Sequence, residues 1–428
     1  MLKREIEEAI QAQTVEADAQ LGMLREALSD LPVERNFATI VTGVRRCGKS
    51  TLLVQWAKRT RLRVVRVLFD DLRLMDFTTD DFALLGKVFA ERRAQAVVLD
   101  EVQDVPGWER FVAGLLPTGM IVLVTGSNAK MLSAELGTKL TGRHLDLRLD
   151  TFSYSEFLRF RKRNPSTKSF DEYLSVGGFP AYVQSRTRQI LVDLFNDILY
   201  RDVVVRYGIG NTMPIKQLAG YLLNHIGTRL APSRLKDAIH VQSAKTVLEY
   251  FDHLAECCLI HRLERFADSP KARMLAQKKV YACDVGLVSA LERGEGVGLG
   301  HKLENLVFLS LRKKGGDLTY FLDAQDRECD FLRETDDGSY EAVQVCWELT
   351  DDNRKREFDG LAAAMKRFGL RRGLIVTHGQ NDEAVKDGCE MVVVSASRYF
   401  ASGGGGSRTV PAVRAVDAAK TEVALSGV

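Results

Sequence analysis

The sequence lacks the features of a membrane or secreted protein. No stretch approaches roughly 18 consecutive apolar residues, and the N-terminus is a charged helix start, Met-Leu-Lys-Arg-Glu-Ile-Glu-Glu. The seven cysteines form no Cys-x-x-Cys pair and are odd in number, which predicts reduced thiols and no zinc site. These absences predict a cytoplasmic protein that has no membrane partner.

Net charge is also small. The chain of 428 residues carries a net charge of +3, so any basic surface for nucleic acid must be local. Apolar residues make up 45% and charged residues 27%, an ordinary globular composition. There is no internal repeat, and the length suffices for roughly two to four domains.

A glycine-rich stretch follows an apolar strand at residues 38–42. It has the form Gly43-x-x-x-x-Gly48-Lys49-Ser50, in which glycines let backbone N–H groups point at phosphates. Lys49 is predicted to reach the β- and γ-phosphates, and the Ser50 hydroxyl to ligate Mg²⁺. The helix that follows turns its positive end towards the anion. The predicted ligands of the nucleoside triphosphate are Gly43, Val44, Arg45, Arg46, Cys47, Gly48, Lys49, Ser50 and Thr51.

A second buried strand, residues 96–99, ends in two carboxylates. Asp100 is predicted to hold Mg²⁺ through water, and Glu101 to orient or deprotonate the attacking water. A carboxylate pair after an apolar run is also typical of an ordinary strand end. The upstream phosphate loop favours the catalytic interpretation.

Two further polar residues are candidates for the same site. Asn128 follows the apolar strand 120–126 and is predicted to sense the γ-phosphate, although it is equally typical of a turn. Arg143 precedes the alternating stretch 145–149 and is predicted to stabilise transition-state charge, either in cis or across the interface of a homo-oligomer. The alternative is a surface arginine with no catalytic task.

The alternation of strands and helices predicts an α/β fold. Residues 63–69 form another strand before the helical stretch 80–93, and residues 103–119 leave room for only one short helix. The acid strand and the strand 120–126 are therefore predicted neighbours in a mostly parallel sheet that carries the P-loop, with helices on both faces. The site lies at the carboxyl edge of that sheet.

Several motifs follow one another in order between residue 35 and about residue 400. They occupy residues 42–50, 69–73, 99–103, 125–128, 140–143, 152–157 and 177–180. In order and spacing they resemble bacterial and archaeal AAA-type ATPases of the STAND-related branch, whose C-terminal half is a domain of unknown function. The resemblance implies an ATP-binding core, a winged-helix segment and a C-terminal domain similar to restriction endonucleases.

The predicted organisation has six parts. They are a helical segment at 1–32, an ATPase core at 33–150, a helical lid or connector at 151–212, a winged helix-turn-helix at 213–285, a nuclease-like α/β domain at 286–400, and a Gly/Ser linker with a disordered tail at 401–428.

The winged-helix prediction also has support from the local pattern. Three helix candidates are followed by two strands at 259–263 and 278–281. If this segment binds double-stranded DNA, the recognition helix and the phosphate contacts are supplied by Ser243, Lys245, Thr246, Arg234 and Lys236. The alternative is a wing that binds protein or a packed subdomain, which the acidic Glu249 and Asp252 favour.

The last domain carries an incomplete set of nuclease residues. Glu304 lies in a helix, Asp330 in a strand and Gln344 in the next strand, a set that would bind Mg²⁺ in a nuclease of this class. The position of the expected lysine holds Cys346, which carries no positive charge at neutral pH. The domain is interpreted as a nuclease scaffold that has lost or relocated a catalytic residue.

Three functions follow from these predictions. The first is a Mg²⁺-dependent ATPase that couples nucleotide state to a DNA-binding C-terminal half. The second is a nucleotide-gated switch that turns over rarely and binds a protein partner. The third is an ATP-dependent nuclease. Glu101 favours hydrolysis, and Cys346 argues against cleavage of nucleic acid.

Overall fold

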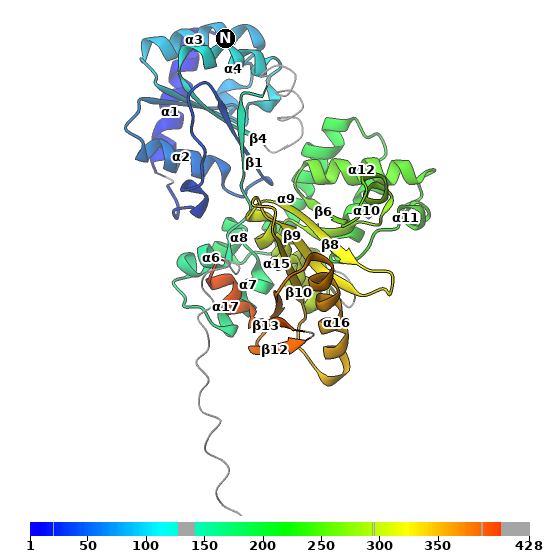
Figure 1. Ribbon diagram of the computed structural model, residues 1–428. Helices are drawn as coiled ribbons and strands as arrows, with labels where there is room; N and C mark the ends of the chain where they lie inside the picture. The colour runs from blue at the N-terminus through cyan, green and yellow to red at the C-terminus, as the bar shows by residue number, and fades with distance from the viewer. Residues whose placement is uncertain (20, 127–141, 293, 295, 387, 404–428) are drawn as a thin grey trace, which may run out of the picture.

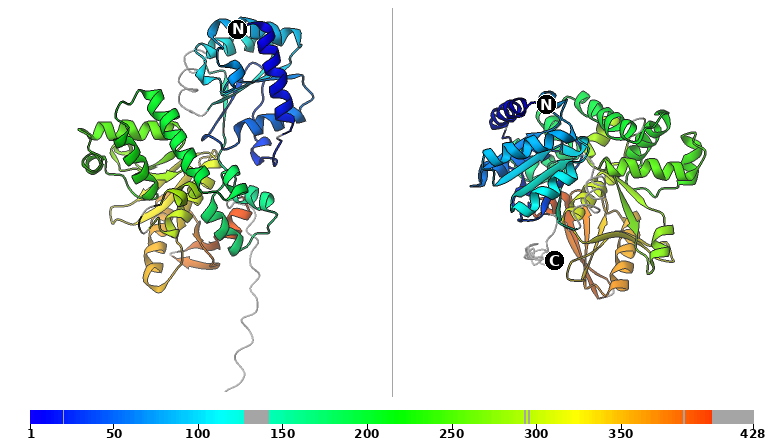
Figure 2. Two further views of the ribbon diagram at one scale, coloured as in Figure 1. Left: turned by 180° about the vertical axis from the view of Figure 1, so that it is seen from behind. Right: turned by 90° about the horizontal axis from the view of Figure 1, so that it is seen from above.

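The computed structural model describes residues 1–403 apart from residues 20, 127–141, 293, 295 and 387. The chain forms two β-sheets, one in each half of the molecule, which are joined by helices (Figures 1 and 2). Within this described part, no helix combines the length and the apolar character needed to cross a membrane.

The N-terminal sheet has five parallel strands. They are β1 (Ala38–Thr42), β2 (Val64–Leu68), β3 (Ala96–Asp100), β4 (Ile121–Gly126) and β5 (His144–Arg148), in the spatial order β2-β3-β4-β1-β5. Every residue of β1 and β3 is buried, as expected for apolar strands covered on both faces. The parallel α/β sheet and the predicted pairing of β3 with β4 are confirmed.

Helices cover both faces of this sheet. On one face α1 (Lys3–Asp18), α3 (Phe82–Glu91) and α4 (Trp108–Leu115) share an apolar core with the strands. On the other face α2 (Lys49–Arg59) lies in a core that extends into α9 (Gln189–Asp197), the π-helical segment η6 (Ile198–Val205) and α10 (Met213–Asn224). The phosphate-loop side of the sheet is thus packed against the second half of the chain.

The helices of the predicted connector at 151–212 pack against two different sheets. Its first helices, α6 (Tyr154–Arg161) and α7 (Thr167–Val176), pack with α17 (Ala396–Ala401) in the core of the second sheet, and α8 (Pro180–Ser185) follows them. Its last elements, α9 and η6, belong to the core beside the phosphate loop. The connector therefore joins the two halves.

The second sheet has eight strands. They are β6 (Ile260–Arg265), β7 (Lys279–Ala282), β8 (Asp317–Leu322), β9 (Glu328–Glu334), β10 (Tyr340–Val345), β11 (Arg372–Thr377), β12 (Asp382–Lys386) and β13 (Cys389–Ser395), in the order β12-β13-β11-β10-β9-β8-β6-β7. The helix α15 (Leu299–Lys313) packs on one face and α16 (Asp351–Phe368) on the other.

This sheet crosses the predicted boundary between residues 285 and 286. The strand β6 pairs with β8, with Glu264 opposite Thr319, so the hairpin β6–β7 continues the sheet of the C-terminal domain. The hairpin follows α10, α11 (Pro232–Ala238) and α12 (Ala244–Glu256), contains the short helix α13 (Pro270–Leu275), and leads into α14 (Val285–Leu291). The two predicted units are therefore continuous.

Candidate nucleotide site

The phosphate loop runs from the end of β1 to the start of α2. A Cβ at Gly43 would lie 2.1 Å from the carbonyl oxygen of Leu149, and Gly48 has a φ of +105°. Both positions therefore favour glycine. The loop curls tightly at the carboxyl edge of the sheet, the place where ligands bind in open α/β folds.

Lys49 points back into this loop. Its Nζ donates to the carbonyl oxygens of Gly43 at 3.1 Å and Val44 at 3.4 Å, and lies 3.5 Å from the Glu101 carboxylate. Burial disfavours the charged ammonium, but the attraction of Glu101 together with smaller contributions from other groups, Asp100 among them, outweighs burial, so the pKa of Lys49 is raised. The side chain is a buried cation whose partners are mostly neutral carbonyl groups.

Asp100 lies beside the Ser50 hydroxyl. Ser50 Oγ donates to Asp100 Oδ1 at 3.0 Å, and Thr125 Oγ1 donates to the same oxygen at 2.6 Å. Asp100 is fully buried. A hydroxyl and a carboxylate are the hard oxygen ligands that Mg²⁺ takes, together with phosphate and water, so these residues fit the ion.

Two contacts of Asp100 had not been predicted. Thr125 ends the neighbouring strand β4, and Arg66 Nη2 donates to Asp100 Oδ2 at 2.5 Å from β2. The signal for Arg66 was a basic residue in the middle of an apolar strand. The signal for Thr125 was a polar residue at the carboxyl end of the strand next to Asp100. Both constrain the carboxylate that is expected to hold the metal.

Glu101 adopts a left-handed backbone conformation, with φ at 54°. Such strain in a residue other than glycine costs about 1–3 kcal/mol and clusters at functional sites. Gln103 Nε2 donates to Glu101 Oε2 at 2.8 Å. Burial raises the pKa of Glu101, but the attraction of Lys49 and Arg45 and the hydrogen bond from Gln103 together outweigh burial and lower the pKa. Glu101 is therefore an ionised carboxylate at neutral pH.

Acidic side chains of α9 and η6 face the arginines of the loop. Arg45 lies 3.6 Å from Asp202, and Arg46 lies 3.3 Å from Asp197. Asp70, at the end of β2, is 3.4 Å from Arg45. These carboxylates were missed because they are distant in sequence and lie in an ordinary amphipathic pattern. The phosphate loop is thus tied to the connector by ion pairs.

The two remaining predicted catalytic residues do not complete this site. Asn128 lies outside the described residues. Ala38 N donates to the carbonyl oxygen of Arg143 at 3.0 Å, so Arg143 lies beside the first residue of β1, whereas the phosphate loop follows the last, Thr42. A strand of this length is about 13 Å long. This placement contradicts the role of Arg143 in cis, and the role across a subunit interface stays a prediction.

The residues predicted to contact DNA lie at α11 and α12. Arg234 is exposed, the Lys245 side chain is 85% exposed, and Lys236 is half-buried and 3.7 Å from Asp237. Ser243 accepts a hydrogen bond from Thr246 N at 3.1 Å and so caps the N-terminus of α12. The hydroxyls of Ser243 and Thr246 lie 3.1 Å apart, so both already have partners.

The predicted nuclease residues are brought together only in part. Glu304 and Asp330 both contact the ammonium of Lys279, at 2.9 and 3.0 Å. The Gln344 side chain turns to Glu357, to which its Nε2 donates at 2.7 Å. Burial raises the pKa of the Cys346 thiol to about 11, so it is neutral.

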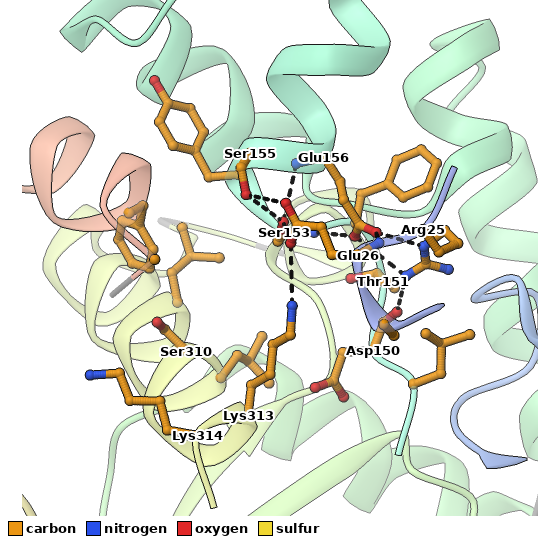
Figure 3. A pocket seen from close by; sticks show the side chains of 18 of the residues that line it. Arg25, Glu26, Asp150, Thr151, Ser153, Ser155, Glu156, Ser310, Lys313 and Lys314 are labelled. Atoms are coloured by element: carbon orange, nitrogen blue, oxygen red, sulfur yellow. Dashed lines mark hydrogen bonds and ion pairs between the residues drawn. The ribbon is translucent and has the colours of Figure 1, made fainter. Parts of the chain in front are cut away.

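A pocket of about 280 Å³ lies between the ATPase half and the C-terminal half (Figure 3). On its wall Arg25 forms a buried ion pair with Glu156 at 2.9 Å and donates from Nη1 to the carbonyl oxygen of Cys47 in the phosphate loop at 2.6 Å. Glu26 accepts hydrogen bonds from Ser153 at 2.8 Å and from Lys313 of α15 at 3.3 Å. The wall thus connects the phosphate loop to the second sheet.

The chain is similar to known sequences over most of its length. Residues 35–158 match the model of an AAA domain, and residues 167–299 match a domain of unknown function (DUF8612). The uncharacterized protein MJ1544 of Methanocaldococcus jannaschii is 30% identical over 389 residues, which cover 85% of this chain and 86% of that protein. An uncharacterized protein of Haemophilus influenzae is 26% identical over 388 residues, which cover 84% of this chain and 94% of that protein.

Two solved structures have weaker likeness. The Walker-type ATPase PABY2304 of Pyrococcus abyssi has a TM-score of 0.41 at 14% identity, covering 68% of this chain and 94% of that chain. The STAND protein PH0952 of Pyrococcus horikoshii, which has a tetratricopeptide repeat sensor, has a TM-score of 0.24 at 13% identity, covering 66% of this chain and 44% of that chain. By its sequence identity and coverage, the chain belongs to the family of the M. jannaschii protein MJ1544, and its N-terminal half carries an AAA domain of the P-loop ATPase type.

Proposed function

We propose that this protein hydrolyses ATP with Mg²⁺ and couples nucleotide state to its C-terminal half. The observation that carries the proposal is the convergence of Lys49, Ser50, Asp100 and Glu101 at the carboxyl edge of one parallel sheet. A site that only stored nucleotide would not need an ionised carboxylate beside the phosphate-binding lysine.

Each residue has one task in the proposed reaction. Lys49 and the loop amides hold the phosphates, and Ser50 and Asp100 would hold Mg²⁺, which neutralises phosphate charge when bound. Glu101 orients the attacking water and accepts its proton. Asn128 is proposed to sense the γ-phosphate, and Arg143 to act across the interface of a homo-oligomer.

The ion pairs around the loop suggest how the binding of nucleotide changes the position of the second half of the chain. Phosphates that enter the loop compete with Asp202 for Arg45 and with Asp197 for Arg46. A phosphate and a carboxylate at the same guanidinium group repel each other. Release of these pairs would move α9 and η6, and Arg25 offers a second connection through Glu156. The two halves would then have one arrangement with nucleotide bound and another without it.

The partner proposed for the C-terminal half is double-stranded DNA. Arg234 and Lys245 are exposed on adjacent helices, where both can reach phosphates. A protein partner is the second candidate, because α12 also exposes Leu248 and Glu249, which suit a mixed protein surface better than a polyanion.

The test is steady-state ATP hydrolysis with and without double-stranded DNA. Lys49→Ala and Glu101→Gln should abolish turnover, while the exposed Lys87→Ala and Glu34→Gln serve as matched controls that retain it. Turnover that rises with DNA supports the coupled ATPase. Turnover that ignores DNA favours the protein-binding switch, and tight ATP binding without turnover would contradict the proposed hydrolysis.

A further inference from the structure

A buried ion cluster occupies the place where the nuclease resemblance implies a metal. Lys279 of β7 lies among three carboxylates, with its Nζ 2.9 Å from Glu304, 2.6 Å from Glu328 and 3.0 Å from Asp330. Lys279 is 3% exposed, and Glu304 and Asp330 are 8% and 7% exposed. Helix α15 and strand β9, which carry the acids, thus meet β7 at one cation.

The ammonium group is saturated by these contacts. A lysine has three N–H donors, and three carboxylates surround Lys279. Each carboxylate also has another partner. Tyr281 OH donates to Glu304 at 2.7 Å, Val345 N donates to Asp330 Oδ2 at 3.0 Å, and Arg229 Nε donates to Glu328 at 3.1 Å.

A divalent ion does not fit this arrangement. Mg²⁺ needs oxygen ligands about 2.0–2.1 Å from its centre, and the space between Glu304 and Asp330 already holds Lys279 Nζ. Gln344, the third implied ligand, is bonded to Glu357. In the described residues, no set of three or more His, Cys, Asp or Glu side chains is arranged to hold a metal ion.

A loop also closes one side of the cluster. Gly227 N donates to the carbonyl oxygen of Val280 at 2.7 Å, and a Cβ at Gly227 would lie 2.8 Å from His301 Nδ1 and 3.0 Å from Glu304 Oε2. Arg229 in the same loop binds Glu328. A nucleic-acid phosphate approaching from this side would meet backbone and a paired arginine.

We propose that Lys279 is a built-in cation that replaces the divalent metal in this nuclease-like domain. The side chain offsets part of the negative charge of the acids, ties the hairpin β6–β7 to α15 and β9, and excludes metal-dependent cleavage at this site. This inference concerns the C-terminal half and does not depend on ATP hydrolysis.

The test is Mn²⁺ titration of the nucleotide-free full chain, with bound metal measured by electron paramagnetic resonance. Wild type and Asp330→Asn should bind Mn²⁺ identically. Lys279→Met should gain one bound Mn²⁺ per chain, and Lys279→Met/Asp330→Asn should lose it again. Lys302→Met, which removes a buried lysine of α15 paired with Glu292, is the control and should gain none.

Two results would overturn the proposal. One is a Mn²⁺ ion that wild type binds and Asp330→Asn lacks. The other is a folded Lys279→Met, with a wild-type circular dichroism spectrum, that gains no ion. If Lys279→Met does not fold, the comparison of wild type with Asp330→Asn decides whether the native cluster excludes metal.

Discussion

Each half of the molecule buries a lysine next to carboxylates, but the two lysines have different partners. Lys49 donates to two carbonyl oxygens of its own loop and lies 3.5 Å from one carboxylate. Lys279 lies within 3.0 Å of three carboxylates. Weak neutral partners can be exchanged for the phosphates of a ligand, whereas three anionic partners cannot be displaced at similar cost.

The same contrast appears in the surroundings of the two sites. The phosphate loop packs closely at Gly43, and Lys49 is held by carbonyl oxygens of the same loop. At the second sheet, the loop that contains Gly227 packs directly against the carboxylate of Glu304 and covers it. A set of acidic residues with nuclease-like placement in the sequence is therefore insufficient to predict a metal site, because the cation between them can come from a distant strand.

The largest effect is expected at the nucleotide site. Glu101→Gln should lower ATP turnover about 100-fold to 10,000-fold while ATP binding is retained, because the amide cannot accept a proton from water. Turnover assays and nucleotide binding by fluorescence check this, with Glu34→Gln as control. A Glu101→Gln variant with undiminished turnover would show that another group serves as the base.

The next effect is on stability at the ion cluster. Lys279→Met should lower the free energy of unfolding by about 3–5 kcal/mol without metal, because it leaves several buried carboxylates without their cation. Urea denaturation measures the change. Lys302→Met removes a cation paired with one carboxylate, so its loss should be smaller, and equal losses would contradict the special position of Lys279.

A buried acid that lacks a cation sharpens the comparison. For Glu304 burial raises the pKa, but the attraction of Lys279 and the hydrogen bonds from His301 and Tyr281 together outweigh burial and lower the pKa. Asp284 forms no ion pair within the described residues, and burial raises its pKa from 3.8 to about 6 despite hydrogen bonds from Gly178 and Thr151. A nearby cation alone does not decide the direction, because Asp330 lies 3.0 Å from Lys279 and its pKa is nevertheless raised by burial and by repulsion from Glu304 and Glu328.

This difference predicts a pH dependence. Between pH about 4 and about 6 the folded state holds the Asp284 proton that the unfolded state has lost, so stability falls as pH rises through this window, by about 3 kcal/mol for this group. Asp284→Asn removes the titration, and denaturation curves at several pH values should lack this fall. Parallel pH profiles of wild type and variant would contradict the prediction.

The smallest effect is expected at Arg66. Arg66→Gln removes the cation that holds one oxygen of the buried Asp100, so the Mg²⁺ concentration for half-maximal turnover should fall about fivefold, which corresponds to ~1 kcal/mol of binding free energy. Mg²⁺ titration of ATP hydrolysis measures it, and Arg63→Gln on the same strand edge is a control. A higher Mg²⁺ requirement would show that Arg66 positions Asp100 for the metal.

The sequence predicted the parts of the site that lie close together along the chain. The phosphate loop, the strand that ends in Asp100 and Glu101, and the pairing of β3 with β4 follow from contiguous patterns, and the structure has these elements at the predicted places. Thr125 and Arg66 were missed because each is a single polar residue in an apolar strand, and only the register shows that they contact Asp100.

Contiguous residues determined this much because backbone turns, strand burial and helix caps depend on local side chains and periodicity. Only the tertiary structure decided that Arg143 lies at the amino edge of the sheet, that the hairpin β6–β7 joins the C-terminal sheet, and that Lys279 meets Glu304 and Asp330. Those outcomes depend on strand order and on charges distant in sequence, and no local pattern records which distant cation will neutralise a buried acid.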